Sequence, residues 1–217
     1  SDGEEKTEGG RFARDQGRDV DFDALGAAGS DYVHGPEPSG CYNGAPGTNV
    51  LLLSERGGEL KLDPVYWGYG PEWWDKQPLI NARGETASSG RMFKPLWAHG
   101  RAVVFADGWY EWARSGDKKQ PYFIYEKQHK PLFFAAIGKA PYDDIHVHEG
   151  FVIVTSASNK GMVDIHDRRP LVLEASAVRE WLSEDTTPER AEQIAWKAAL
   201  PESDFKWHPV TDKVGSP

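Results

Sequence analysis

The sequence predicts an α+β fold: a single domain built on an antiparallel, barrel-like β-sheet with a few peripheral helices. Six runs rich in β-branched and aromatic residues, each bounded by Gly, Pro or Asp, are typical of strands. The segments with helical patterning are fewer and do not alternate regularly with these runs, which disfavours a parallel α/β sheet. No internal repeat or low-complexity linker interrupts residues 10–217, so we expect them to form one domain.

The expected elements follow from local composition. Residues 20–28 are compatible with a short helix, residues 34–40 with a loop, and residues 42–48 contain the Asn-Gly and Pro-Gly pairs of a tight turn. Helices are expected at residues 89–100, 174–182 and 187–200, the last with Thr187 as N-cap. Strands are expected, in chain order, at residues 49–56, 59–68, 101–113, 121–126, 131–138, 151–157 and 205–211.

Composition and charge narrow the possible functions. A formal net charge of −9 argues against a generic, charge-driven nucleic-acid binder but is compatible with a local basic cleft. The single cysteine, Cys41, rules out an internal disulfide and favours a cytoplasmic location. No apolar run reaches the length of a membrane span. Residues 1–9 are acidic and polar, and we expect a disordered leader or a cloning remnant.

Two motifs carry candidate catalytic or binding groups. In DGWYEW, residues 107–112, Glu111 lies among aromatic residues, where lost hydration would raise its pKa and suit it to general acid–base chemistry. The alternative is a glutamate that faces solvent. In PLINARGETA, residues 78–87, Asn81 could orient a carbonyl or an amine and Arg83 could grip a phosphate. The alternative is an asparagine-stabilised turn with a solvated arginine.

The segment DIHDRRP, residues 164–170, allows three interpretations. A metal site at His166 would need further ligands, and the other close histidine pair, His146 and His148, is expected in an exposed hairpin loop. We therefore expect no metal. A catalytic His166 beside an anion-binding Arg168 is the more economical interpretation. A capped turn before a strand remains the structural alternative.

Apolar groups suited to nucleic-acid contacts occur in two places. Pro46 lies in the predicted turn, and Trp73 and Trp74 follow in GPEWWDK. Such side chains stack on bases or wedge between them. The alternative is that the tryptophans belong to the core and that Pro46 belongs to an ordinary turn.

The order of these motifs along the chain is more specific than any one of them. GRFA, YNGAPGT, DPVYWGYGPEWWDKQPLINAR, RMFKPLW, FADGWYEW, KKQPYFIY, AAIG and DIHDRRPLVL follow one another. Together they resemble the SOS-response-associated peptidase (SRAP) family, from Gly10 to about Gly215. The resemblance implies the SRAP fold and a protein that recognises abasic sites in single-stranded DNA. Family members crosslink covalently to the lesion through a cysteine exposed by removal of the initiator methionine.

The resemblance also implies residue roles. Glu111 would be the general acid–base group, His166 would help open the sugar and govern reversal, and Asn81 would position the reacting groups. It implies no metal or cofactor, and a monomer that binds an abasic site in single-stranded DNA, including at a junction with duplex. It implies a cytoplasmic protein, associated with the nucleoid when bound to DNA. The DNA-binding set that it implies is Arg11, Pro46, Trp73, Trp74, Arg83, Arg91 and Arg168.

One departure from the family pattern bears on the chemistry. The family begins Met-Cys-Gly-Arg-Phe, whereas this chain has Gly9, preceded by eight residues, where the cysteine should stand. In the family, an α-amine attacks the sugar aldehyde to give a Schiff base, and the thiolate then closes a thiazolidine ring. We therefore expect covalent capture to be impaired, and whether the chain is an enzyme stays open. The alternatives are a thiol peptidase or amidase that uses Cys41 with His166 and Asn81, and a purely non-covalent module that binds single-stranded DNA.

Overall fold

The computed structural model describes residues 11–13, 32–34, 43–139, 148–157 and 168–211. Their helices are α1 (Lys94–His99), α2 (Ala175–Leu182), α3 (Pro188–Lys197) and a 3-10 turn at Glu202–Asp204. The strands of the smaller sheet are β1 (Arg11–Ala13), β3 (Asn43–Gly44), β8 (Gly108–Ser115), β9 (Lys118–Glu126) and β14 (Phe205–Pro209). The strands of the larger sheet are β2 (Tyr32–His34), β4 (Asn49–Arg56), β5 (Glu59–Tyr66), β6 (Asn81–Arg83), β7 (Arg101–Ala106), β10 (Leu132–Gly138), β11 (Phe151–Ala157), β12 (Arg168–Pro170) and β13 (Val172–Leu173).

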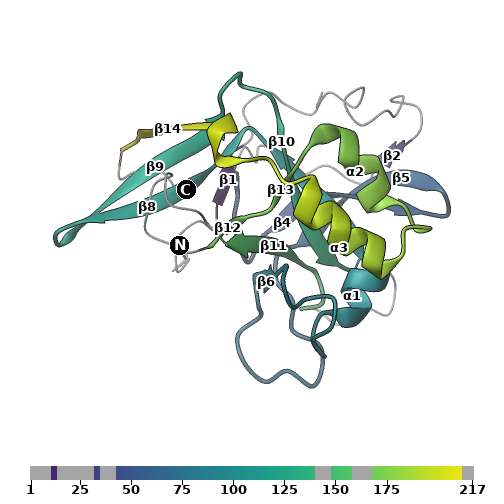
Figure 1. The fold of residues 1–217 in the computed structure, drawn as a ribbon. Coiled ribbons are helices and arrows are strands. Elements are labelled where there is room, and N and C mark those ends of the chain that lie inside the picture. Colours follow the sequence, from purple (N-terminus) through teal and green to yellow (C-terminus); the bar gives the residue numbers. More distant parts are fainter. Residues whose placement is uncertain (1–10, 14–31, 35–42, 140–147, 158–167, 212–217) are drawn as a thin grey trace.

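The two sheets are mostly antiparallel and lie beside a group of helices (Figure 1). The smaller sheet has the order β14-β9-β8-β1-β3, and the larger has the order β12-β11-β10-β7-β4-β5-β2, with β13 on β10 and β6 on β11. The α+β prediction is confirmed. Over the described residues neither strand order closes on itself, so the term barrel-like applies only loosely.

The larger sheet is buried on both faces, and the alternation of side chains along β7 and β10 shows how. Val103 and Phe133 belong to the apolar cluster shared with the helices. Val104 and Phe134 belong to a second cluster, shared with Trp109 of the smaller sheet. Successive side chains in a strand point to opposite faces, so a sheet covered on both sides needs a continuous apolar run. This need explains why all residues of β7 and β10 are buried.

The predicted strand at 101–113 is wrong in one respect, because it is two strands in different sheets. β7 ends at Ala106, and β8 begins at Gly108 and pairs with β9. The backbones approach so closely there that a Cβ at Gly108 would lie 2.2 Å from the carbonyl oxygen of Ile124. Glycine is therefore required where the chain passes from one sheet to the other.

The other predicted helices and strands match the structure in type. The predicted helix at 89–100 is shorter, since residues 89–93 are turns before α1. Thr187 caps α3 as predicted: its hydroxyl oxygen accepts a hydrogen bond from the backbone N–H of Arg190 at 3.1 Å. Short strands β6 and β12 were not predicted, and both lie at the candidate site. The predicted features at residues 1–9, 20–28 and most of 34–40 lie outside the described residues.

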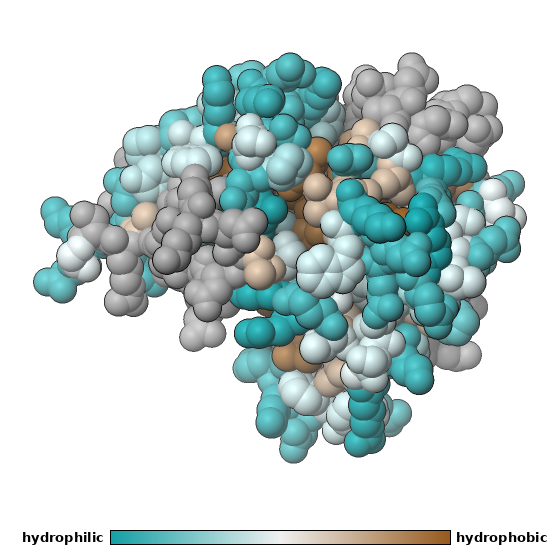
Figure 2. Space-filling model, in the orientation of Figure 1, coloured by the Kyte–Doolittle hydropathy of each residue, from teal (hydrophilic) through white to brown (hydrophobic). Residues whose placement is uncertain are grey.

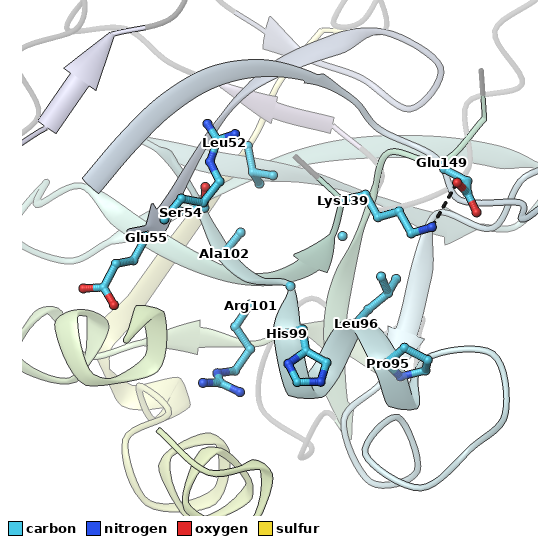
Figure 3. Close-up of a pocket in the computed structure, with 13 residues that line it drawn as sticks. Leu52, Ser54, Glu55, Pro95, Leu96, His99, Arg101, Ala102, Lys139 and Glu149 are labelled. Carbon is cyan, nitrogen blue, oxygen red and sulfur yellow. Dashed lines mark hydrogen bonds and ion pairs between the residues drawn. The ribbon is translucent and has the colours of Figure 1, made fainter. Parts of the chain in front are cut away.

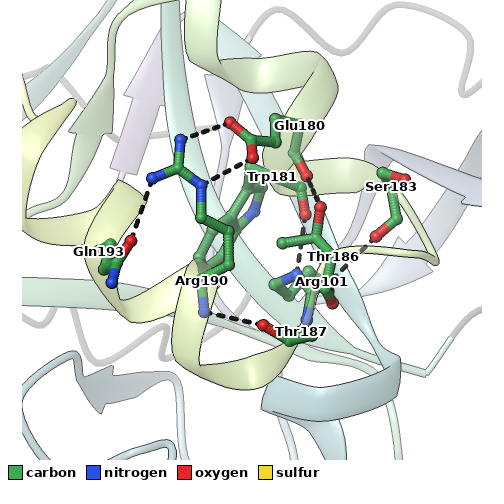
Figure 4. Close-up of polar contacts among 8 residues, drawn as sticks. All are labelled: Arg101, Glu180, Trp181, Ser183, Thr186, Thr187, Arg190 and Gln193. Atoms are coloured by element: carbon green, nitrogen blue, oxygen red, sulfur yellow. Dashed lines mark hydrogen bonds and ion pairs between the residues drawn. The ribbon is translucent and has the colours of Figure 1, made fainter.

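Arg101 of β7 links the larger sheet to the helices by hydrogen bonds (Figure 4). This buried guanidinium donates to backbone carbonyls of α1 and its end, Trp97 and Ala98, and of the segment that ends α2. Carbonyls at a helix C-terminus have no partner within the helix and carry partial negative charge, so a cation is favourable there. The acceptors in the second segment are the carbonyls of Trp181, Ser183 and Thr186.

The surface agrees with this core arrangement. On the face shown in Figure 2, hydrophilic residues cover most of the area and apolar residues show only as small patches. No helix in the part of the chain that the structure describes is both long and apolar enough to cross a membrane.

Candidate nucleic-acid interface

The carboxyl end of β11 lies between two short strands that carry predicted site residues. Thr155 pairs with Arg83 of β6, in parallel, and with Pro170 of β12, in antiparallel register. A strand has two edges, so β6 and β12 flank this end of β11. The predicted polar loop at 78–87 therefore contains a strand, and that strand brings Asn81 and Arg83 beside the segment that carries Arg168.

The pairing register also sets the direction of the β6 side chains. Asn81 lies opposite Ile153, whose side chain belongs to the apolar layer between the two sheets. Residues paired across parallel strands share a face, and residues two apart do too. Asn81 and Arg83 therefore face the side of the smaller sheet. Both are exposed, so they lie at the edge of that layer.

Arg168 is held at this edge by two groups. Its Nη2 donates to the backbone carbonyl and to the hydroxyl of Thr155, each at 3.0 Å. Nη2 also donates to Oε1 of Glu85 at 2.9 Å, and Nη1 donates to Oε2 of the same carboxylate. The hydrogen bonds from Arg168, assisted by the charges of Arg168 and Arg83, hold the pKa of Glu85 below its ordinary value. Arg83, Glu85 and Arg168 thus form one charged cluster.

Glu111 lies on β8 in the layer between the sheets, and the solvent-facing alternative is wrong. Only 6% of the residue is exposed. It shares a face of β8 with Trp109, whose indole N–H donates to Oε1 of Glu111 at 3.0 Å. The other fully buried tryptophans, Trp67, Trp97 and Trp181, donate to backbone carbonyls instead. A buried indole that donates to a carboxylate marks this position as unlike the ordinary core.

Trp73 is not a core residue. It is 53% exposed, and the guanidinium of Arg91 lies 4.4 Å from the centroid of its ring. Trp74 meets Trp73 edge-on and is fixed by a hydrogen bond from its indole N–H to the carbonyl of Gln77 at 2.8 Å. The loops around β6, which extend below the sheets in Figure 1, therefore carry an exposed aromatic ring beside a cation.

Pro46 occupies the predicted tight turn, over residues 45–48. Gly47 has a φ of +82°, and the N–H of Thr48 donates to the carbonyl of Ala45 at 3.2 Å. Proline at the second position and a left-handed glycine at the third are what a type II turn needs. Pro46 is half-buried.

Several predicted residues lie outside the described residues: Gly9, Cys41, His146 and His166. Arg11 is described only through its backbone, which pairs with Tyr110 in β8. Because Tyr110 precedes Glu111, this pairing brings β1 beside the buried carboxylate. His148 is exposed at a turn, in keeping with the predicted exposed loop.

A separate pocket of about 480 Å³ is not built from these residues (Figure 3). It lies between β4, α1 and β7, and an ion pair of 3.0 Å between Lys139 and Glu149 lies at its margin. None of the predicted site residues is among its lining residues. Over the described residues there is also no group of three or more His, Cys, Asp or Glu side chains placed to hold a metal ion.

The chain is similar to known proteins in sequence and in fold. The family model for SOS response associated peptidase (SRAP) matches residues 10–217. This chain belongs to the SRAP family. It is 56% identical to the abasic site processing protein YedK of Escherichia coli over 95% of this chain and 94% of that one. It is 31% identical to the abasic site processing protein YoaM of Bacillus subtilis, over 81% of this chain and 80% of that one.

Solved structures give the same picture of the SRAP fold. A phage-related protein from Bordetella bronchiseptica superposes with a TM-score of 0.80 at 35% identity, covering 95% of this chain and 96% of the other. A protein from Bacteroides thetaiotaomicron, at 19% identity, shares the fold with a TM-score of 0.65 over 79% of this chain and 78% of that one.

The charged edge consists of Arg83, Glu85, Thr155 and Arg168, and two of these residues were not predicted from the sequence. Thr155 follows the apolar residues of β11, two positions before the strand ends, and Glu85 lies in the same polar segment as Asn81 and Arg83. The signal for Glu85 was its position two residues after an arginine. Only the fold shows that its partner is Arg168, 83 residues further along the chain.

Proposed function

We propose that this chain binds single-stranded DNA at abasic sites, including sites at a junction with duplex DNA, and that it does so as a monomer. The observation that carries the proposal is its 56% identity, over 95% of its length, to a protein named for abasic site processing. The location that this function requires is the cytoplasm, at the nucleoid when the protein is bound to DNA.

The charged edge supplies groups for the DNA backbone. Arg83 and Arg168 lie on either side of the end of β11, and forked guanidinium donors match the oxygens of a phosphodiester. Arg11 and Arg91 complete the proposed set of phosphate contacts. Because the chain as a whole carries a net charge of −9, DNA must be held by this local group rather than by a general positive field.

The loop that carries Trp73 and Trp74, the aromatic loop, supplies groups for the bases. The exposed ring of Trp73 is placed to stack on a base, and Trp74 and Pro46 form the proposed apolar wedge that fills the space left by the missing base. Stacking of this kind is tolerant of sequence, as recognition of a lesion requires, since a missing base can occur in any sequence context.

The proposed chemistry uses the open-chain aldehyde of the abasic sugar. Glu111 would transfer protons at the reacting carbon, Asn81 would position the reacting groups, and His166 would assist ring opening and its reversal. Gly9 stands where the family has its nucleophilic cysteine and carries no thiol, so it cannot close a thiazolidine ring. We therefore propose recognition without stable covalent capture.

Binding of short labelled oligonucleotides tests the proposal. Fluorescence anisotropy should show tighter binding to single-stranded DNA with a central abasic site than to the intact strand or to duplex. Denaturing gel electrophoresis after incubation with the true abasic strand should show no crosslink. Equal affinity for all three DNAs would refute the proposed recognition, and a gel-stable crosslink would refute the loss of covalent capture.

Restoring the nucleophile tests the proposed catalytic residues. A Gly9→Cys variant whose chain begins at that cysteine should form the gel-stable crosslink, because the amine and thiol would again be adjacent. Adding Glu111→Gln should slow the crosslinking by about 100-fold, the usual contribution of a general acid–base group. A restored cysteine that does not crosslink, although the DNA still binds, would argue against the roles of Glu111 and His166.

A further inference from the structure

Glu85 occupies the position where a phosphate would meet Arg168. Its two carboxylate oxygens accept from both terminal nitrogens of the guanidinium, with the Nη2–Oε1 distance at 2.9 Å. The non-bridging oxygens of a phosphodiester bind a guanidinium in the same forked manner. While Glu85 stays in place, a DNA phosphate cannot make that forked contact with Arg168.

We propose that Glu85 is an internal placeholder for a DNA phosphate, and that a phosphodiester displaces it from Arg168 when DNA binds. The inference rests on the proposed function, because it assigns Arg168 to the DNA backbone. In this role, Glu85 lowers the affinity of the protein for DNA in general. Only a strand whose phosphate is correctly placed regains the free energy of the displaced ion pair.

Two features of the cluster allow the exchange. Arg168 keeps its contacts to the carbonyl and hydroxyl of Thr155 when the carboxylate leaves, so the guanidinium stays oriented. Glu85 lies at the surface, where 37% of its side chain is exposed, and can turn into water. Exposed ion pairs contribute little to stability, so the exchange costs little.

Arg83 gives an incoming phosphate the same electrostatic environment that the carboxylate has. Its positive charge acts on Glu85 together with that of Arg168. A phosphate in place of the carboxylate would face the same two cations, and it would not be tied to the protein backbone. The placeholder therefore keeps two like charges compensated in the free protein and leaves them available to DNA.

The competing interpretation is that Glu85 is a positioning residue that holds Arg168 ready for DNA. The two interpretations predict opposite signs. Removing a placeholder tightens DNA binding, whereas removing a positioning residue weakens it. Glu85→Gln separates them because it keeps the size and hydrogen-bonding shape of the side chain and removes the charge.

The chain offers a matched control pair. Glu180 also accepts two hydrogen bonds from one guanidinium, that of Arg190, with Nε–Oε2 at 2.7 Å and Nη2–Oε1 at 2.8 Å (Figure 4). This pair links α2 and α3 and shares no contact with the charged edge. Glu180→Gln therefore changes the net charge as Glu85→Gln does, but frees an arginine that has no proposed role with DNA.

The experiment compares the wild-type chain with Glu85→Gln, Arg168→Ala, the double variant and Glu180→Gln. The probe is a fluorescein-labelled single strand with a central tetrahydrofuran, an abasic analogue with no aldehyde, titrated at several salt concentrations. We expect Glu85→Gln to tighten binding about fivefold with little change in the slope of log affinity against log salt, because Arg168 contacts the same phosphate in both complexes. We expect Arg168→Ala to weaken binding and Glu180→Gln to leave it unchanged.

The double variant completes the test. In the Arg168→Ala background, Glu85→Gln should have little effect, because the arginine that it frees is absent. Equal tightening in that background, or tightening by Glu180→Gln, would reduce the effect to net charge and overturn the inference. Weakening by Glu85→Gln would overturn it in favour of a positioning role. A wild-type chain that binds no single-stranded DNA would overturn the proposed function as well, whereas binding without a gain in Glu85→Gln overturns the placeholder alone.

Discussion

Arg101 and Arg168 show two ways in which this fold partners an arginine. Both guanidiniums are held by the chain itself, but Arg101 is buried, whereas 22% of the Arg168 side chain is exposed. Arg101 donates to five backbone carbonyls of two helical segments. Arg168 donates to one carbonyl, one hydroxyl and the carboxylate of Glu85.

The two arginines differ in whether their hydrogen-bond partners can move away. These carbonyls belong to the backbone of α1, of α2 and of the turn that follows α2, and they cannot move away without local unfolding, so Arg101 is a structural residue. The Glu85 carboxylate is at the end of a flexible, exposed side chain, and it can be replaced by another anion. An arginine with a removable partner at a surface edge is suited to binding, whereas one with fixed partners is suited to stability.

Replacing each arginine by methionine should produce the largest difference between the two residues. Arg101→Met leaves several buried carbonyls without a donor, and we expect a loss of about 3–5 kcal/mol in the free energy of unfolding. This corresponds to a fall in Tm of roughly 6–20 °C for a chain of this size. Arg168→Met should lower the free energy of unfolding by less than about 1 kcal/mol, because its ion pair is at the surface.

Thermal denaturation and anisotropy with the abasic-analogue strand measure the two effects together. At a temperature where both proteins are folded, Arg101→Met should bind DNA like the wild type, and Arg168→Met should not. If the two variants lose the same stability, the distinction between fixed and removable partners is wrong.

The two exposed tryptophans offer the next largest effect. Trp73, at the aromatic loop, and Trp196, on α3, are 53% and 75% exposed. Trp73→Ala should weaken binding to single-stranded DNA by about 5–150-fold, the range for loss of one stacked base. Trp196→Ala should change the affinity by less than about twofold, because α3 is not part of the proposed interface. Similar losses in both would place the DNA elsewhere than at the aromatic loop.

The two regions also differ in how well the sequence predicts them. The strands β4, β7 and β10 each contain an apolar run of at least four residues, and burial on both faces makes such runs easy to identify. The break at Asp107 was not predicted, because the residues on both sides of it favour strands equally. What separates them is a close approach of Gly108 to a distant strand, which local composition does not reveal.

The sequence predicted individual residues of the candidate site, but it did not predict that they lie close together. Asn81 and Arg83 follow an apolar lead-in and Arg168 lies in a charged segment just before an apolar run, so they stand out in the sequence. Their neighbourhood depends on the parallel pairing of β6 with β11, which joins segments about 70 residues apart. Glu85 could not be assigned a partner for the same reason, since its ion pair forms only after β11 and β12 are in place.

The smallest expected effect concerns pH and the strength of the Glu85–Arg168 pair. The pKa of Glu85 is lowered in the folded protein, first by the hydrogen bonds from Arg168 and then by the charges of Arg168 and Arg83. A lowered folded-state pKa contributes stability above the unfolded-state pKa of about 4.3, and that contribution is lost as the pH falls through the folded-state value. Glu85→Gln should therefore be less stable than the wild type at pH 7, by less than about 1 kcal/mol because the pair is exposed, and the difference should shrink as the pH falls below about 4.3.

Urea denaturation at pH 7 and in acid measures this difference, with Glu180→Gln as the control for another carboxylate that accepts two hydrogen bonds from one arginine. A small value at pH 7 is what a placeholder requires, because a phosphate must displace the carboxylate at little cost. If the pair contributed several kcal/mol at pH 7, DNA could not release Arg168 readily. Arg168 would then belong with Arg101 among the fixed residues of the fold, and the DNA backbone would have to be held by Arg83 and its neighbours without it.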